Sequence, residues 1–437
     1  MTNDRQTGRR GALRILLSAY ACEPNRGSEP GIGWNWASEL DRQGHHVVVL
    51  TRTNNREAIE AALAKTPTMA SLTFAYYDLP VAFLFLKRLG LLPMQIYYLL
   101  WQVFCVRTAR RAVLDHDVDV VWHLTFGAVR LPSLLWRLGK PFVFGPGGGG
   151  EYAPFAMRRD YPLGGQLRDL ARDALNWLSK FDPLLRTTFA KAALIFVKTP
   201  ESARLVPRGW RDKTKVYLEN GVAQVASVRE ATPPAGRILY AGSFVYLKGI
   251  PIAIRAFAAF VRLGGVGRFT LVGRGSEKVR CQRLARELGV DHLLDWISWV
   301  DQRELDRIYA AHDLFLFPSL HDSSGNVVAE AMSHGLPVIG FDLGGPAQII
   351  TKDSGVIVAT ARLDSRTAAQ ALGLALKNLF DDPVEFRRLS LGALQRAKDF
   401  TWSARISGAV QELRTSLSLT GDACAKTIVE PARTHVS

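Results

Sequence analysis

The sequence of 437 residues has few cysteines, no paired metal-ligand motif and no convincing secretion signal. Its four cysteines lie far apart and form no C-x-x-C pair, which argues against a zinc site and a disulfide framework. The apolar stretch after Arg9 and Arg10 is interrupted by Arg14, so it predicts a buried strand and not a signal peptide. We therefore expect a cytoplasmic protein.

Charged residues are also scarce, at 22% of the chain, and no long run has one sign, although the net charge is +15. The basic residues occur as short pairs such as Lys87-Arg88, without interleaved stacking aromatic residues. This pattern argues against nucleic acid as a partner. An anionic substrate or an anionic membrane surface remains.

Long apolar runs are absent except for residues 89–106, which carry no charge and are followed by Arg107, Arg110 and Arg111. Eighteen residues are at the lower limit for a membrane span. Pro93 and the glutamines in this run favour a core or interfacial helix instead. A peripheral position at the inner face of the plasma membrane is therefore an alternative to a purely cytoplasmic one.

Strand and helix patterns alternate along both halves of the chain, and the strands are almost continuously apolar. This predicts an α/β protein with two doubly wound, Rossmann-like domains that face a central cleft. The proline-containing segment 228–237 is the expected linker. We predict an N-terminal acceptor-side domain (1–230), a donor domain (236–399), a C-terminal capping helix (400–418) and a disordered tail (419–437).

The segment HDSSGNVVAEAMSHGLPVIG, residues 321–340, carries the clearest chemical signal. It follows a predicted strand, and a helix is expected from Asn326 to a stop at Gly335. Ser324, Gly325 and Asn326 would then lie at a helix N-terminus, where unpaired amides favour an anion. Glu330 lies one turn into this helix.

The carboxylates of Asp322 and Glu330 would repel phosphate, so their expected partners are hydroxyl groups. A nucleotide sugar offers phosphates flanked by two hydroxyl-rich rings and fits this combination. The alternative is a solvated loop with two surface acids.

These residues resemble the signature of the family 4 retaining glycosyltransferases, the group 1 enzymes with a two-domain GT-B fold. The shared features are the two acids separated by seven residues and the following Ala-Met-x-x-Gly-x-Pro-Val-Ile run. The resemblance implies that Glu330 holds the ribose of the nucleotide and that Asp322, where the family usually has Glu, contacts the donor sugar.

The segment YAGSFVYLKGIPIAIRAF also resembles the family pattern, which implies that Lys248 neutralises the donor diphosphate. Ser243 replaces a basic residue that is frequent in the family, and Arg274 is a candidate to compensate for it. Resemblance at SWVD implies that the backbone near Val300 lies beside the donor base.

Glycine-rich loops follow two strands of the first half. Gly31 and Gly33 would allow a phosphate to approach the backbone, or would only form a tight turn. The run Gly147–Gly150 is costly to order unless something approaches closely, so we assign Gly148, Gly149 and Glu151 to the acceptor side.

His123 follows a strand, and its resemblance to a family histidine near the donor anomeric carbon makes it the catalytic candidate beside Asp322 and Lys248. A lone histidine is more often structural. Asp117 and Asp119 precede their strand, so we expect neither a catalytic metal nor a cofactor.

The predicted function is retaining transfer of a sugar from a nucleotide-diphosphate sugar to a hydroxyl group. The basic surface suggests lipid-linked acceptors of bacterial envelope polysaccharide, lipopolysaccharide or glycolipid synthesis. A catalytically inactive GT-B protein that binds nucleotide sugars or carbohydrates is the alternative.

Overall fold

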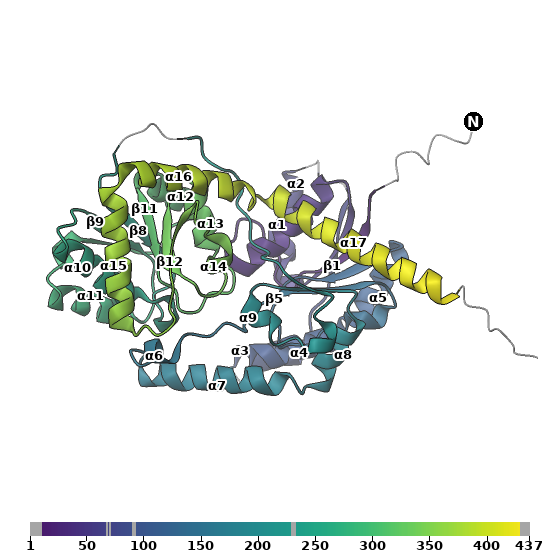
Figure 1. Cartoon of the computed structure of the whole chain (residues 1–437). Helices are drawn as coiled ribbons and strands as arrows, with labels where there is room; N and C mark the ends of the chain where they lie inside the picture. The colour runs from purple at the N-terminus through teal and green to yellow at the C-terminus, as the bar shows by residue number, and fades with distance from the viewer. Residues whose placement is uncertain (1–10, 67–68, 70, 90–92, 229–232, 429–437) are drawn as a thin grey trace, which may run out of the picture.

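The computed structural model describes residues 11–428, except 67–68, 70, 90–92 and 229–232 (Figure 1). The first ten residues, the last nine and part of the predicted linker lie outside the described residues. Two parallel sheets, each flanked by helices, make up the molecule.

The first sheet has the order β3-β2-β1-β4-β5-β6-β7, and all of its pairings are parallel. Its strands are short and almost wholly buried in the middle of the sheet, as expected when helices cover both faces. The strands are β1 (Arg14–Ser18), β2 (His46–Thr51), β3 (Leu72–Tyr76), β4 (Val120–His123), β5 (Phe142–Gly147), β6 (Leu194–Val197) and β7 (Thr214–Val216).

Nine α-helices of the described residues connect these strands. They are α1 (Ser28–Arg42), α2 (Arg56–Ala64), α3 (Val81–Arg88), α4 (Met94–Phe104), α5 (Val106–Asp115), α6 (Phe155–Arg158), α7 (Leu163–Ser179), α8 (Pro183–Lys191) and α9 (Pro200–Ala203).

The apolar run 89–106 contains α4, which buries Tyr97, Tyr98 and Trp101 completely and leaves Ile96 and Phe104 about half exposed. It is thus in part a core helix. No helix in the described part of the chain is both long enough and apolar enough to cross a bilayer.

The second sheet has the order β10-β9-β8-β11-β12-β13 and is also parallel throughout. In both sheets the order reverses after the first strand, which confirms the predicted doubly wound fold. Its strands are β8 (Arg237–Ala241), β9 (Arg268–Val272), β10 (Leu294–Ile297), β11 (Leu314–Phe317), β12 (Val338–Phe341) and β13 (Gly355–Val358).

Seven α-helices of the described residues accompany this second sheet, and α13 begins at Asn326 as the sequence predicts. They are α10 (Ile250–Arg262), α11 (Lys278–Glu287), α12 (Gln302–Ala311), α13 (Asn326–Ser333), α14 (Pro346–Ile349), α15 (Ser365–Asp381) and α16 (Pro383–Lys398).

Two segments pack against the opposite half of the molecule from the one that their position in the sequence suggests. Ala153, Met157 and Tyr161, around α6, belong to the core of the second sheet. The last helix, α17 (Trp402–Ile428), leaves the second sheet and lies across the first (Figure 1). Both crossings tie the two halves together.

The helix α17 is also longer than predicted. The sequence predicts that this helix ends at residue 418 and that a disordered tail follows. In the structure the helix continues to Ile428. Residues 429–437 lie outside the described part of the chain.

Candidate functional site

The loop between β11 and α13 is fixed by its own backbone and by Asp322. Gly325 precedes α13 with φ +67°, a left-handed conformation that suits glycine. The Asp322 Oδ1 accepts hydrogen bonds from the amides of Ser324 (3.1 Å) and Gly325 (2.9 Å). A side chain at Gly344 would lie 2.2 Å from the Asp322 carbonyl oxygen, so the next loop packs directly against this one.

Lys248 reaches the same carboxylate from the end of a short 3-10 turn, Tyr246–Lys248. Its Nζ lies 2.5 Å from the Asp322 Oδ2, and both side chains are mostly buried. Burial alone would raise the pKa of Asp322, but Lys248 and the two amides lower it. The two residues assigned to sugar and diphosphate therefore contact each other in this structure.

The first turn of α13 still presents unpaired polar groups. Among the described residues, no acceptor lies within hydrogen-bonding distance of the backbone amides of Asn326 and Val327. The Asn326 Oδ1 is buried and has no partner there either. These amides and the remaining N–H groups of Lys248 could bind an anion.

Glu330 lies on the next turn of α13, where it accepts a hydrogen bond from the Tyr309 hydroxyl at 3.2 Å. Burial raises the pKa of Glu330 to about 7. Near neutral pH this carboxyl group therefore exchanges between the acid and the carboxylate form. The carboxylate accepts a hydrogen bond from a hydroxyl group, and the acid can donate one to it.

The other predicted donor residues surround this loop less closely. Arg274 is exposed, and its guanidinium carbon lies 6.0 Å from the centre of the Trp299 ring. Ser243 is exposed. Val300 packs at the edge of the second core. In the described part of the chain, neither Arg274 nor Ser243 makes a polar side-chain contact with Lys248 or Asp322.

Glu151 joins the two halves of the molecule. Its carboxylate accepts hydrogen bonds from Thr199 Oγ1, Ser202 Oγ, the Gly149 amide and Ser323 Oγ, all at 2.8 Å. Burial alone would raise its pKa, but the nearby His321 and these hydrogen bonds lower it. Glu151 is therefore an ionised buried link and does not face an open acceptor pocket.

The glycine run packs tightly at this junction. A side chain at Gly148 would lie 2.7 Å from the Ser323 Cβ, and the carbonyl oxygen of Gly149 accepts a hydrogen bond from Asn176 Nδ2 at 2.9 Å. The close approach expected of these glycines is therefore made by protein atoms from α7 and from the loop before α13.

Lys198 and Glu219 form a second buried link that the sequence analysis missed. Lys198 Nζ lies 2.5 Å from Glu219 Oε1, and the Ser324 hydroxyl donates to the same oxygen at 2.8 Å. Burial alone would lower the pKa of Lys198, but Glu219 and Glu29 raise it. No sequence pattern marks Glu219.

Gly31 and Gly33 lie within α1 and are buried. Side chains there would lie 1.9 Å from the Arg26 carbonyl oxygen and 2.1 Å from that of Ala21. Their role in this structure is the close packing of α1 against the loop after β1, so they do not form the tight turn that was the alternative interpretation.

His123 does not face the cleft edge as expected. It is 2% exposed, and its ring lies near Phe144 and the Tyr98 hydroxyl, which is 3.2 Å from Nε2. Burial lowers the pKa of His123 to about 4, so the ring is neutral. Its Nδ1 has no partner among the described residues.

A cavity of about 550 Å³ opens elsewhere, between α1 and the start of α17. Asn35, Glu39, Arg42 and Trp402 are among its lining residues, and no predicted site residue is among them. Within the described residues, no group of three or more potential ligands is placed to hold a metal ion.

Comparison with known proteins gives these features a context. The family model Glycosyl transferases group 1 matches residues 235–378, the domain that carries Lys248, Asp322 and Glu330. D-inositol 3-phosphate glycosyltransferase of Corynebacterium aurimucosum is 32% identical over 176 residues, which are 38% of this chain and 40% of that protein. The lipopolysaccharide core biosynthesis glycosyltransferase LpsE of Rhizobium meliloti is 32% identical over 170 residues, 38% of this chain and 48% of that protein.

The chain thus matches less than half the length of these curated relatives. A solved structure extends the likeness to both sheets. Anabaena Alr3699/HepE in complex with UDP superposes with a TM-score of 0.59 over 92% of this chain and 100% of that one, at 14% identity. At this identity the match concerns the fold alone.

Proposed function

The chain belongs to the group 1 glycosyltransferases of GT-B fold, and on this premise we propose that it transfers a sugar from a nucleotide-diphosphate sugar to a hydroxyl acceptor, with retention of the anomeric configuration. The observation that carries this proposal is the grouping of Lys248, two unpaired α13 amides and Glu330 at one loop. A diphosphate and an adjacent ribose would meet complementary groups there.

Binding of the donor requires no new cation at this loop. A lysine ammonium has three N–H donors, and Asp322 takes one of them. The diphosphate would accept from the others and from the amides of Asn326 and Val327, at the positive end of the α13 dipole. Asp322 would hold Lys248 in place and be close enough to meet a sugar hydroxyl.

In the proposed reaction the bond between the anomeric carbon and the diphosphate oxygen breaks, and its electron pair leaves with the nucleoside diphosphate. The acceptor oxygen forms the new bond to the same carbon, and its proton passes to the departing diphosphate. Lys248 and the α13 amides would stabilise the charge that develops on the leaving group. This account uses neither a metal nor a cofactor.

The nature of the donor and acceptor follows from weaker arguments. One protein of the same fold was solved with UDP, so UDP-sugars are the first donors to test. The name of the Rhizobium relative refers to lipopolysaccharide core synthesis, and the net charge of +15 suits an anionic, lipid-linked acceptor of the cell envelope at a membrane face.

A binding protein without turnover is the second candidate, because Asp322 already occupies Lys248 and two amides. The two are separated by a thermal-shift panel of UDP-, GDP- and ADP-sugars, followed by a turnover assay with the sugar that stabilises most. We expect release of nucleoside diphosphate and a product whose anomeric proton coupling matches that of the donor. Binding without any release over days would favour the second candidate.

A further inference from the structure

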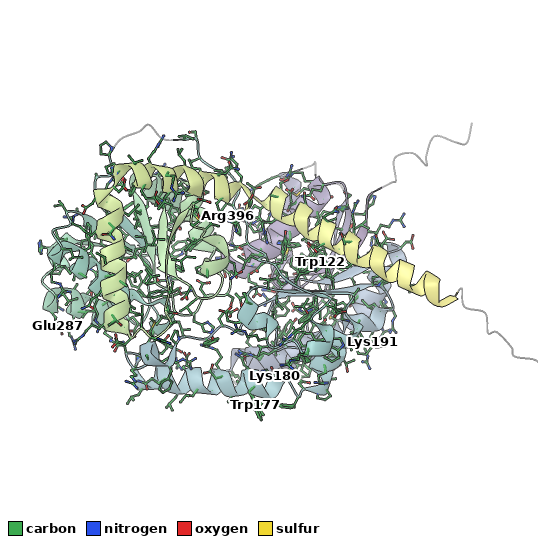
Figure 2. The ribbon with its side chains drawn as sticks, viewed as in Figure 1. Trp122, Trp177, Lys180, Lys191, Glu287 and Arg396 are labelled. Atoms are coloured by element: carbon green, nitrogen blue, oxygen red, sulfur yellow. The ribbon has the colours of Figure 1, made fainter. Side chains whose placement is uncertain are left out.

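The helix α7 turns its apolar side chains away from the protein. Its spacing of three, four and seven residues aligns them on one face, and each is more than half exposed. Together with Phe181, two residues after the helix end, the residues here named the α7 stripe are Leu163, Leu167, Leu170, Trp177 and Leu178. Figure 2 shows Trp177 at the outer edge of the molecule.

The opposite face of α7 is polar and attaches the helix to the protein. Asp169 is 2% exposed and pairs with Arg172 at 2.7 Å and with Arg158. Asn176 donates to the Gly149 carbonyl oxygen and accepts from Arg130 at 3.0 Å. A surface helix normally shows the reverse arrangement, with its apolar face on the core, so the α7 stripe is left uncovered by the part of the chain that the structure describes.

More apolar side chains extend the exposed region around α7. Phe155 and Leu184 flank the helix in sequence and are 70% and 54% exposed. In the view of Figure 1, α3, α4, α7 and α8 all lie along the lower edge of the molecule, and α3 and α4 expose Phe85, Val103 and Phe104. Exposed apolar side chains gathered on one helix face, as in the α7 stripe, indicate an interaction site.

The carboxylates near the stripe all have partners, since Asp182 accepts hydrogen bonds from the first amides of α8. Both carboxylates of α7 are occupied, since Asp169 pairs with Arg172 and Asp173 pairs with Arg158. Arg168, beside the stripe, and Lys180, directly after the helix, have no carboxylate within ion-pair distance among the described residues. The surface therefore combines an apolar face containing tryptophan with unpaired cations.

We propose that the α7 stripe is a docking surface for an anionic lipid bilayer. Leucine, phenylalanine and tryptophan would enter the boundary between headgroups and acyl chains, and Arg168 and Lys180 would bind anionic headgroups. Because Asn176 of α7 bonds to Gly149, the docked helix would hold the junction of Gly148 and Glu151 above the membrane. The part of this inference that concerns a lipid-linked acceptor rests on the proposed function, whereas docking itself does not.

The test is co-sedimentation of the full chain with vesicles of phosphatidylglycerol and phosphatidylcholine, compared with vesicles of phosphatidylcholine alone. We expect binding to the anionic vesicles that weakens with salt. The double variant L167Q/W177Q should lose at least about tenfold in vesicle affinity, because two apolar side chains no longer enter the bilayer. The variant R168Q/K180Q should lose about fivefold for each charge.

The matched control is V266Q/V384Q, two changes at exposed valines of the second domain, with 87% and 81% exposure. It should bind vesicles as the unchanged chain does, and thermal unfolding should be similar for all variants. The inference is wrong if the unchanged chain ignores anionic vesicles, or if L167Q/W177Q binds them equally well. It is also wrong if light scattering shows that L167Q/W177Q converts a dimer into a monomer, since a second copy would then cover the stripe.

Nucleotide-sugar turnover is measured on the same samples without vesicles. Turnover with no vesicle binding would overturn the docking surface and leave the proposed function in place. Vesicle binding that depends on the stripe, with no turnover for any donor, would overturn the proposed function and leave the docking surface in place.

Discussion

Asp322 shows how much of a site depends on one side-chain orientation. The sequence correctly placed an acid beside a helix N-terminus. It did not predict that the carboxylate of this acid would accept hydrogen bonds from two amides of its own loop and from Lys248. Sequence spacing gives the position of Cα and leaves side-chain torsions open. The consequence is that Lys248 is held in place before any donor binds.

Replacement of Lys248 by alanine tests this arrangement. Lys248→Ala leaves the mostly buried carboxylate of Asp322 without its cation. It also removes the positive charge that would stabilise the leaving diphosphate. We expect a loss of about 10²-fold or more in kcat/KM and of about 1–3 kcal/mol in the free energy of unfolding. The control is Lys377→Ala, which removes a lysine from the ion pair with Asp381 and should change neither kcat/KM nor the free energy of unfolding. Turnover by Lys248→Ala equal to that of the unchanged chain would refute the role of Lys248 in stabilising the leaving group.

Glu330 makes stability depend on pH. Its raised pKa of about 7 means that the folded chain holds a proton more tightly than the unfolded chain, so this residue opposes folding increasingly as the pH rises toward 7. Glu330→Gln should therefore stabilise the protein by up to about 3 kcal/mol at pH 8 and much less at pH 4. Denaturant unfolding at both pH values measures this difference, and a gain that is equal at both would contradict it.

His123, Lys198 and Glu219 mark the limit of prediction at the scale of residues. The end of a strand predicts that a side chain lies near the ligand edge, but Tyr98 and Phe144 cover His123. Glu219 and Ser324 are far apart in sequence and meet only in three dimensions. A single sequence carries no signal for such a contact.

At the scale of elements, prediction succeeded where one local rule acts alone. The sequence displays Gly335 after α13 and the capping residues Asp364 and Asp382 before α15 and α16. The helix α17 extends past its expected end at residue 418 and continues through Gly421, a residue type that often ends a helix. For α7 the periodicity is visible, but its direction is set by Asp169 and Asn176, which hydrogen-bond inward.

Glu151 gives the element scale its prediction, since it connects the loop after β5, the start of α9 and the loop before α13. Glu151→Ala removes the acceptor of four hydrogen bonds, two of them from the fully buried Thr199 and Ser202, and should destabilise the protein by about 2–4 kcal/mol. Because the pKa of Glu151 is lowered, its contribution is present at neutral pH and is lost as the pH falls through the folded pKa.

Thermal unfolding of Glu151→Ala at pH 7 measures this loss. Glu412→Ala is the matched control, because Glu412 makes only a half-exposed pair with Lys215 at 3.8 Å. A melting temperature of Glu151→Ala that equals that of the control would contradict the linking role.

At the scale of the whole molecule, the two halves are interleaved. The sequence predicted two domains joined at a linker near residue 230, and it could not show that α6 packs with the second core while α17 packs with the first. Whether a helix crosses to the other half depends on which sheet still has an apolar face that no other helix covers. Local composition does not report this.

Truncation tests the role of α17 in the first domain. Ile406, Ala409, Val410 and Leu413 are at most 5% exposed in the first core. A chain that ends at Thr401 exposes this core and should lose several kcal/mol, at about 1.5–3 kcal/mol for each large apolar side chain. A chain that ends at residue 418 keeps these contacts and should melt within a few degrees of the full chain; similar melting of both truncations would contradict the packing.

The most direct measurement of the central claim is calorimetric titration of the protein with UDP, GDP and ADP. The account predicts that one diphosphate binds, that the corresponding nucleoside without phosphates does not, and that Lys248→Ala weakens the diphosphate at least tenfold while Lys377→Ala does not. Binding that survives in Lys248→Ala, or no binding of any nucleoside diphosphate, would contradict it.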